Sequence, residues 1–154
     1  MILVDSTVWI DLLRNCETVP VSRLRKLLDA GEATVAPVIV QELLQGAADA
    51  AGFAKLYAYF TAIPLSGAEN SLELHVSAGR LYARARWQGL TPRSPRRCLI
   101  AVTAVRTRLP LLHDDRDFEH LALVEPKLHL IARRRRYFSN QQARLSGMNQ
   151  PMLV

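Results

Sequence analysis

The chain has 154 residues, of which 49% are hydrophobic and 22% charged, and its formal net charge is +6. This length supports one domain with its own core. No apolar run approaches the roughly 18 residues of a membrane span, and no basic region precedes the N-terminal apolar run, so we expect a cytoplasmic protein without a signal peptide. The arginine excess favours an anionic partner such as nucleic acid, although a solvated basic face would give the same composition.

Short apolar runs with strand character alternate along the chain with segments of helical periodicity. Strands are expected over residues 2–4, 33–36, 62–65, 110–113 and 127–131. Helices are expected over residues 6–13, 21–30, 37–46, 47–61, 68–88 and 96–108, with a short turn or helix over 118–122. This alternation predicts an α/β fold in which a central, mostly parallel sheet has helices on both faces. In the 68–88 helix we place Leu72, Val76 and Leu81 near the core side.

The last part of the chain differs in composition from the rest. Residues 1–132 are expected to form the domain, whereas residues 133–154 begin with four arginines and continue without an apolar period. Such a segment is typical of a basic, flexible tail. Cys16 and Cys98 lie far apart without metal-ligand spacing, so we interpret both as buried thiols, with a disulfide or a reactive role as alternatives.

Four carboxylates stand where an acidic site can form. Asp5 follows the first strand, Asp115 and Asp117 follow the 110–113 strand, and Glu42 lies among apolar neighbours in a helix. Ligands bind outside the carboxyl ends of the strands in open α/β sheets. Clustered carboxylates raise one another's pKa values, and a divalent cation such as Mg²⁺ or Mn²⁺ relieves the repulsion and can orient water at a phosphodiester.

Each of these residues also has a purely structural interpretation. Asp5 can be a helix N-cap, although Ser6 or Thr7 can fill the same role. Glu42 can be an exposed helix residue, and Asp115 and Asp117 can be turn formers. His113, just before the aspartates, can assist a site or serve only the structure.

Four stretches of sequence follow one another in an order that resembles a known family. They are ILVDSTVWIDLL at the start, APVIVQELLQG around Glu42, GLTPRS with CLIAVTAV, and LPLLHDDRDFEHLA. Together they span about residues 1–131 and are similar to PIN-domain proteins, specifically the VapC-type toxins of bacterial toxin–antitoxin pairs.

The resemblance implies a fold and a function. It implies a PIN-like α/β fold and a ribonuclease that depends on Mg²⁺ or Mn²⁺, cuts tRNA or rRNA, and is silenced by a cognate VapB-type antitoxin. A homodimer is common among such toxins. Matched by position, Asp5, Glu42 and Asp115 are the catalytic and metal-binding acids, Asp117 is a further metal ligand, and Thr7 or Ser6 is the polar residue beside the metal.

Arginines near these motifs are candidates for holding the RNA backbone. Arg93 and Arg96 are the first candidates, together with the 80–86 segment and the 133–136 run. Trp87 can add base stacking to the charge of Arg84 and Arg86, with a solvated helix end as the equal alternative.

One position departs from the family pattern. The residue before CLIA is usually Asp, but here it is Arg97, which cannot ligate a metal and stays protonated. Beside a divalent cation it would cost on the order of several kcal/mol. Arg97 can instead pair with Glu42 or Asp115 and take the metal's place. The chain is then either a natural degenerate member or one whose substitution silences a toxic enzyme.

Three functions are therefore compared. The first is a toxin endoribonuclease that Arg97 impairs. The second is a catalytically inactive protein that binds RNA or an antitoxin. The third is an α/β protein with no role on nucleic acid.

Overall fold

The computed structural model describes residues 1–69 and 71–131. Its strands are β1 (Ile2–Val4), β2 (Ala33–Thr34), β3 (Leu111–Leu112) and β4 (Leu130–Ile131). Its helices are α1 (Ser6–Leu13), α2 (Val19–Asp29), α3 (Pro37–Leu44), α4 (Ala50–Thr61), α5 (Leu72–Trp87), α6 (Pro95–Thr107) and α7 (Arg116–Val124). The tail predicted over 133–154 lies outside the described residues, so the domain boundary stays a prediction.

The four strands form one parallel sheet in the order β2-β1-β3-β4. Leu3 on β1 is paired with Thr34 on one side and with Leu111 on the other. The expected strand over 62–65 does not form, and only Leu65 pairs there, in an isolated parallel bridge with Val35. The predicted parallel sheet is confirmed, and it is short.

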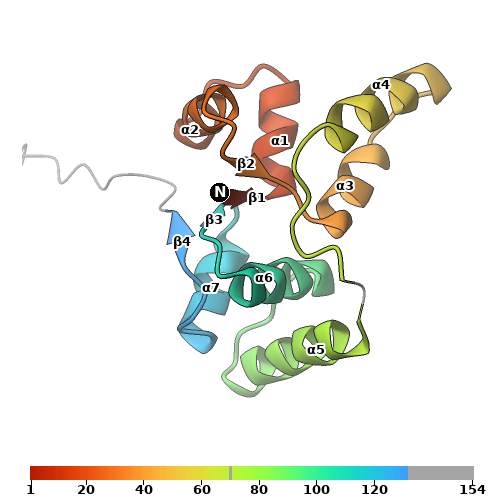
Figure 1. Ribbon diagram of the computed structural model, residues 1–154. Coiled ribbons are helices and arrows are strands. Elements are labelled where there is room, and N and C mark those ends of the chain that lie inside the picture. The colour runs from red at the N-terminus through yellow and green to blue at the C-terminus, as the bar shows by residue number, and fades with distance from the viewer. Residues whose placement is uncertain (70, 132–154) are drawn as a thin grey trace, which may run out of the picture.

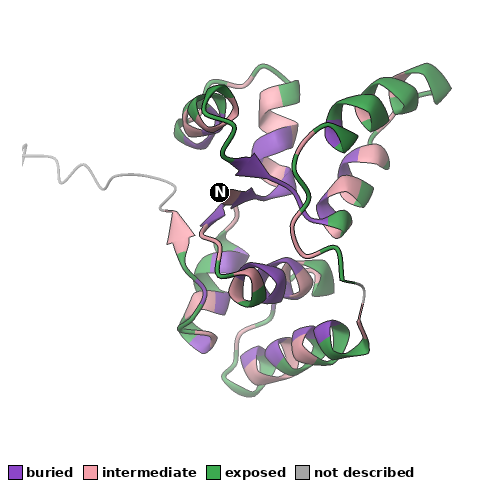
Figure 2. Cartoon of the chain, viewed as in Figure 1, coloured by how far each residue is buried: buried purple, intermediate pink, exposed green. Residues whose placement is uncertain are grey.

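Helices cover both faces of this sheet. In Figure 1, α1 and α2 lie on one side of the strands, and α5, α6 and α7 lie on the other. Parallel strands that are covered on both faces should be apolar throughout, and Leu3, Val4, Leu111 and Leu112 are indeed fully buried. Figure 2 shows the buried residues gathered on the strands and on the inner faces of the helices.

The core side of α5 differs from the one predicted. Leu72 is 80% exposed and Val76 is 49% exposed, and of the predicted residues only Leu81 is buried. The buried face is instead formed by Leu74, Ala78, Leu81 and Ala85. Small residues let α5 approach α6 closely, so its alanines face the core and two of its larger apolar side chains face outward.

Within residues 1–69 and 71–131, no helix is both long and apolar enough to cross a membrane.

Candidate active site

Two aspartates lie at the same edge of the sheet because β1 and β3 are adjacent and parallel. Asp5 directly follows β1, and its N–H donates to the Leu112 carbonyl at 2.9 Å. Asp115 follows β3 and is the N-cap of α7, where its Oδ1 accepts from the Asp117 N–H at 2.9 Å. The carboxyl ends of these two strands thus bring residues 110 positions apart to one place.

Asp5 is both a site residue and a helix cap. It is the N-cap of α1 and accepts from the Thr7 N–H at 3.0 Å, so of the three candidates for the cap, Asp5, Ser6 and Thr7, the structure has Asp5. The cap falls one residue earlier because the strand ends at Val4 and Asp5 keeps an extended backbone. The Thr7 hydroxyl also donates to Asp5 Oδ2 at 2.5 Å.

Burial dominates the electrostatics of Asp5. Asp5 is only 2% exposed, and desolvation of its carboxyl group raises the pKa from 3.8 to about 6. The two hydrogen bonds from Thr7 lower this pKa, the negative charge of Glu42 raises it, and the positive charge of Arg97 lowers it. Asp5 therefore shares an electrostatic environment with Glu42 and Arg97.

Glu42 comes to the site from α3. Its Oε2 accepts a hydrogen bond from the Ser6 hydroxyl at 2.8 Å. Its Oε1 lies 3.4 Å from Arg96 Nη1, and the same nitrogen donates to Gln45 Oε1 at 3.3 Å. Glu42 is thus held from two sides rather than being a solvated helix residue.

Arg97 lies between the acids that follow β3. Its Nε is 2.7 Å from Asp115 Oδ2 and 3.4 Å from Asp117 Oδ2, and its Nη2 also contacts Asp115. Burial opposes the ionised form of Asp115, but hydrogen bonds from the Asp117 N–H and from Arg97, with the charges of Arg97 and Arg93, outweigh it and lower the Asp115 pKa. Burial likewise opposes the charge of Arg97, but Asp115, Asp117 and Asp5 together raise its pKa.

The predicted RNA-binding arginines are also placed by the structure. The Arg93 backbone N–H donates to Asp117 Oδ2 at 2.9 Å, while Arg93 and Arg96 are exposed residues. Arg84 lies elsewhere, because it reaches α7 and bonds to the Val124 carbonyl and Glu125. Arg86 and Trp87 are exposed at the end of α5.

His113 is a site neighbour whose role is structural in this geometry. It is buried, its Nδ1 accepts from the Asp115 N–H at 3.2 Å, and its ring lies 5.3 Å from that of Phe118. This contact holds the turn that carries Asp115. The sequence predicts Ser6 only as a helix cap or a polar residue beside the metal, and its place next to Asp5 is the one signal in the sequence for its contact with Glu42.

The model of the PIN domain family matches residues 2–124. The chain belongs to the PIN-domain family. It is 31% identical over 126 residues to the VapC ribonuclease Mb1587 of Mycobacterium bovis and to ribonuclease VapC11 of Mycobacterium tuberculosis, and the match covers 80% of this chain and 93% of each relative.

Solved structures show the same fold. VapBC2 from Rickettsia felis, bound to a DNA fragment from its promoter, has a TM-score of 0.65 at 17% identity, and the match covers 85% of this chain and 98% of that one. VapBC-1 from nontypeable Haemophilus influenzae has a TM-score of 0.64 at 17% identity, with 85% and 97% covered. The similarity spans nearly the whole part of this PIN domain that the structure describes.

A divalent metal is implied by the family resemblance, so its fit to this PIN domain was tested on the side chains. Among the described residues, no group of three His, Cys, Asp or Glu side chains is arranged to hold a metal ion. Asp115 and Asp117 present their carboxylates to the Arg97 guanidinium. With Arg97 in this position, the cluster of Asp5, Glu42, Asp115 and Asp117, which we call the acidic pocket, does not fit a divalent cation.

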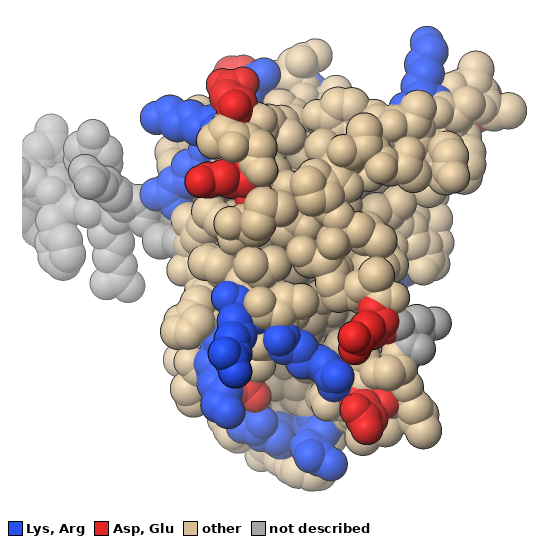
Figure 3. Space-filling model, viewed as in Figure 1, with Lys and Arg blue, Asp and Glu red and all other residues tan. Residues whose placement is uncertain are grey.

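Basic side chains gather on the half of this PIN domain that α5, α6 and α7 build (Figure 3). The exposed arginines of these helices and of the loop before α6 are Arg80, Arg86, Arg93, Arg96, Arg106 and Arg116. Two of them, Arg93 and Arg96, also contact acids of the site. The acidic pocket is therefore bordered by positive charge.

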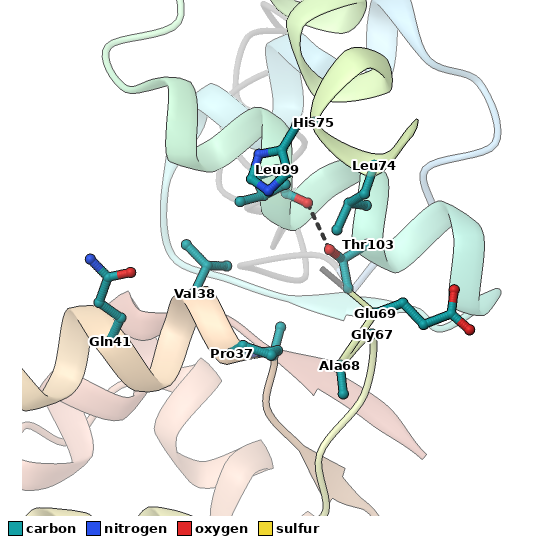
Figure 4. A pocket seen from close by; sticks show the side chains of 11 residues that line it. Pro37, Val38, Gln41, Gly67, Ala68, Glu69, Leu74, His75, Leu99 and Thr103 are labelled. Atoms are coloured by element: carbon teal, nitrogen blue, oxygen red, sulfur yellow. Dashed lines mark hydrogen bonds between the residues drawn. The ribbon is translucent and has the colours of Figure 1, made fainter. Parts of the chain in front are cut away.

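A separate hollow lies beside the acidic pocket, between α3, α5, α6 and the loop after Leu65 (Figure 4). Its volume is about 280 Å³, and Val38, Leu74, His75 and Leu99 are among the residues around it. Gln41, which also lines it, precedes Glu42 on α3. The hollow contains none of the four predicted site acids.

Proposed function

We propose that this protein is the toxin component of a VapC-type toxin–antitoxin pair and that RNA is its substrate class. The family's hydrolysis of RNA phosphodiester bonds is impaired in this sequence. Support comes from the acids that meet at the edge of the sheet, from the exposed arginines beside them, and from relatives that are ribonucleases. The proposed site acids are Asp5, Glu42, Asp115 and Asp117.

The observation that carries the proposed impairment is the contact of Arg97 with Asp115. A guanidinium 2.7 Å from a carboxylate oxygen neutralises that acid and repels a second cation. The protein therefore combines the fold and acidic positions of the family with a cation of its own inside the pocket. We expect slow or absent hydrolysis of RNA with Mg²⁺ or Mn²⁺.

RNA is held by charge around the pocket. Arg93 is exposed at the pocket border while its backbone binds Asp117, so its side chain is available to a phosphate. Arg96 can serve the same purpose only by leaving Glu42, from which it is 3.4 Å away. Thr7 is bonded to Asp5 and Asp114, which suits a role in positioning Asp5 rather than in binding RNA directly.

The proposed partner is a VapB-type antitoxin. Structural neighbours of this fold are VapBC complexes. The large apolar side chains of α1 and α4 divide into two groups: Trp9 and Phe60 are fully buried in the core, while Leu13, Phe53 and Tyr57 are 46%, 46% and 55% exposed. The exposed residues on α1 and α4 are the part that remains for an apolar partner surface. A homodimer and a cytoplasmic location stay predictions.

Cleavage of purified tRNA and rRNA tests the enzymatic proposal. We expect the Arg97→Asp variant with Mn²⁺ to cleave at least about tenfold faster than the chain with Arg97, which corresponds to about 1.4 kcal/mol in activation free energy. The matched control is Arg106→Asp, which makes the same change on α6 at an arginine paired with Glu73. Adding Asp5→Ala to Arg97→Asp should abolish the gain. If the Arg97→Asp variant gains activity and keeps that gain after Asp5→Ala is added, the assigned acids are wrong.

The non-catalytic function is the second candidate, and the same Arg97 contact favours it. In that case the natural chain binds RNA or an antitoxin, and Arg97→Asp gains no activity although it remains folded. RNA binding is measured at several salt concentrations, because phosphate contacts give a linear fall of log affinity with log salt. A flat salt dependence would instead support a protein without a role on nucleic acid.

A further inference from the structure

We propose that the Arg97 guanidinium is the resident cation of the acidic pocket, so that this protein holds its pocket together without a divalent metal. The inference goes beyond the proposed function, because it concerns what stabilises the pocket and its test requires no RNA. It rests on the placement of two consecutive arginines, on the burial of the acids they contact, and on the position of these arginines in α6.

The buried acids of the pocket need a positive charge close to them. Asp5 and Asp117 are 2% and 4% exposed, and the Asp115 side chain is 12% exposed. Carboxylates removed from water near one another are unfavourable unless a positive charge pairs with them. The Arg97 side chain, 25% exposed, reaches two of these acids directly and acts electrostatically on the third.

Arg96 and Arg97 divide the acids between them. Arg97 contacts Asp115 and Asp117 at the start of α7, whereas Arg96 contacts Glu42 on α3. Consecutive residues of a helix point about 100° apart, so one turn of α6 can serve both sides of the pocket. Together the two arginines bring two positive charges, which equals the charge of one Mg²⁺ or Mn²⁺ ion.

The position of these arginines supports a specific role. Both lie in the first turn of α6, which begins at Pro95 after the Ser94 N-cap. The partial positive charge of a helix N-terminus disfavours cations there and favours acids. Arginines in this turn therefore interact unfavourably with the helix dipole, and their contacts with Asp115 and Glu42 offset this unfavourable interaction. Arginines on a solvated helix face would have no acid to offset it.

Thermal unfolding with and without metal tests the inference. The natural chain, Arg97→Gln, Arg97→Asp and the control Arg106→Gln are each unfolded in EDTA and in excess Mn²⁺. We expect the natural chain and Arg106→Gln to show the same Tm in both conditions, within about 1 °C. Arg97→Gln should unfold at a lower Tm in EDTA than the natural chain. It should regain about 5 °C or more in Mn²⁺ when the metal is about 100-fold above its Kd.

Two results would overturn the inference. One is a natural chain whose Tm rises with Mn²⁺ as much as that of Arg97→Gln, because the pocket would then accept metal beside Arg97. The other is a folded Arg97→Gln whose Tm in EDTA equals that of the natural chain and does not respond to Mn²⁺. Arg97→Asp adds a carboxylate, so its Tm should rise most strongly with Mn²⁺. If Arg97→Asp does not fold, the Tm values of Arg97→Gln alone test the inference. Failure to cleave RNA affects only the enzymatic proposal.

Discussion

The Thr7 hydroxyl donates a hydrogen bond to Asp5 Oδ2, and the two oxygens are 2.5 Å apart. The same hydroxyl oxygen accepts from the Asp114 N–H at 3.2 Å. Thr7 therefore connects the buried acid after β1 to the turn after β3. This side chain adds a further link to the β1–β3 pairing and to the Asp5 N–H bond with the Leu112 carbonyl, which already join the two segments.

Replacing Thr7 by Val keeps the shape of the side chain and removes both hydrogen bonds. We expect a loss of about 2 kcal/mol in the free energy of unfolding, because the hydrogen bond from the Asp114 N–H and the hydrogen bond to Asp5 Oδ2 are both lost. Urea denaturation measures this loss. The control is Thr61→Val, whose hydroxyl bonds only within the exposed end of α4 and should cost less than about 1 kcal/mol. Equal losses in the two variants would show that Thr7 has no bridging role.

The raised pKa of Asp5 predicts a pH-dependent stability. Because the pKa is about 6 in the folded protein and usually 3.8, the folded state binds more protons between these values, and this contribution to stability falls as the pH rises from about 4 to 6. Asp5→Asn keeps an N-cap and removes the charge. The variant should therefore gain stability relative to the natural chain on going from pH 4 to pH 7.5, by up to about 3 kcal/mol.

Denaturation curves of both proteins at several pH values, all in EDTA, check this difference. Comparing the two proteins cancels the titration of other groups, such as Asp115, whose lowered pKa gives the opposite trend. A difference that does not change between pH 4 and pH 7.5 would contradict the assigned burial of Asp5.

Arg84 and Arg86 should separate stability from RNA binding. Arg84 contacts the Val124 carbonyl and Glu125, so Arg84→Ala should lower the free energy of unfolding by about 1 kcal/mol and leave the salt dependence of RNA binding unchanged. Arg86 is exposed, so Arg86→Ala should change stability by less than about 0.5 kcal/mol. It should also reduce the slope of log affinity against log salt by about 1. A salt slope that stays unchanged after Arg86→Ala would exclude Arg86 from the RNA surface.

Gly67 is a position where a side chain should not be tolerated. Its φ is +66°, and a Cβ there would overlap Thr103 Cγ2 on α6. Gly67→Ala should therefore cost more than about 2 kcal/mol, since backbone strain and the steric clash add. Gly89, with φ of +77°, has no neighbouring heavy atom within 4 Å of a built Cβ. Gly89→Ala should cost only the strain, about 1–2 kcal/mol. Thermal unfolding of the two variants measures the difference.

Much of the fold could be read from local pattern. The strand at Ile2–Val4, the helix after Pro37 and the parallel sheet follow from apolar runs and turn residues, because these depend on neighbours in the chain. The strand expected over 62–65 reduces to one bridge, because a short apolar run does not show how long its pairing will be. The buried face of α5 was misjudged for a related reason: close packing on α6 selected its alanines, and size alone suggested Leu72 and Val76.

The sequence by itself determined that Asp5 and Asp115 each follow a strand and that Arg97 stands where the family usually has an acid, whereas the pairing of β1 with β3 is a property of the fold. Only the tertiary structure decided which acids Arg97 meets. From the sequence, either Glu42 or Asp115 could be the partner of Arg97. In the structure, Arg97 pairs with Asp115 and Asp117, and Arg96 pairs with Glu42. The reason is physical: a long side chain pairs with whatever charge the packing brings within about 4 Å. That distance depends on how α3, α6 and α7 pack, which no local pattern records.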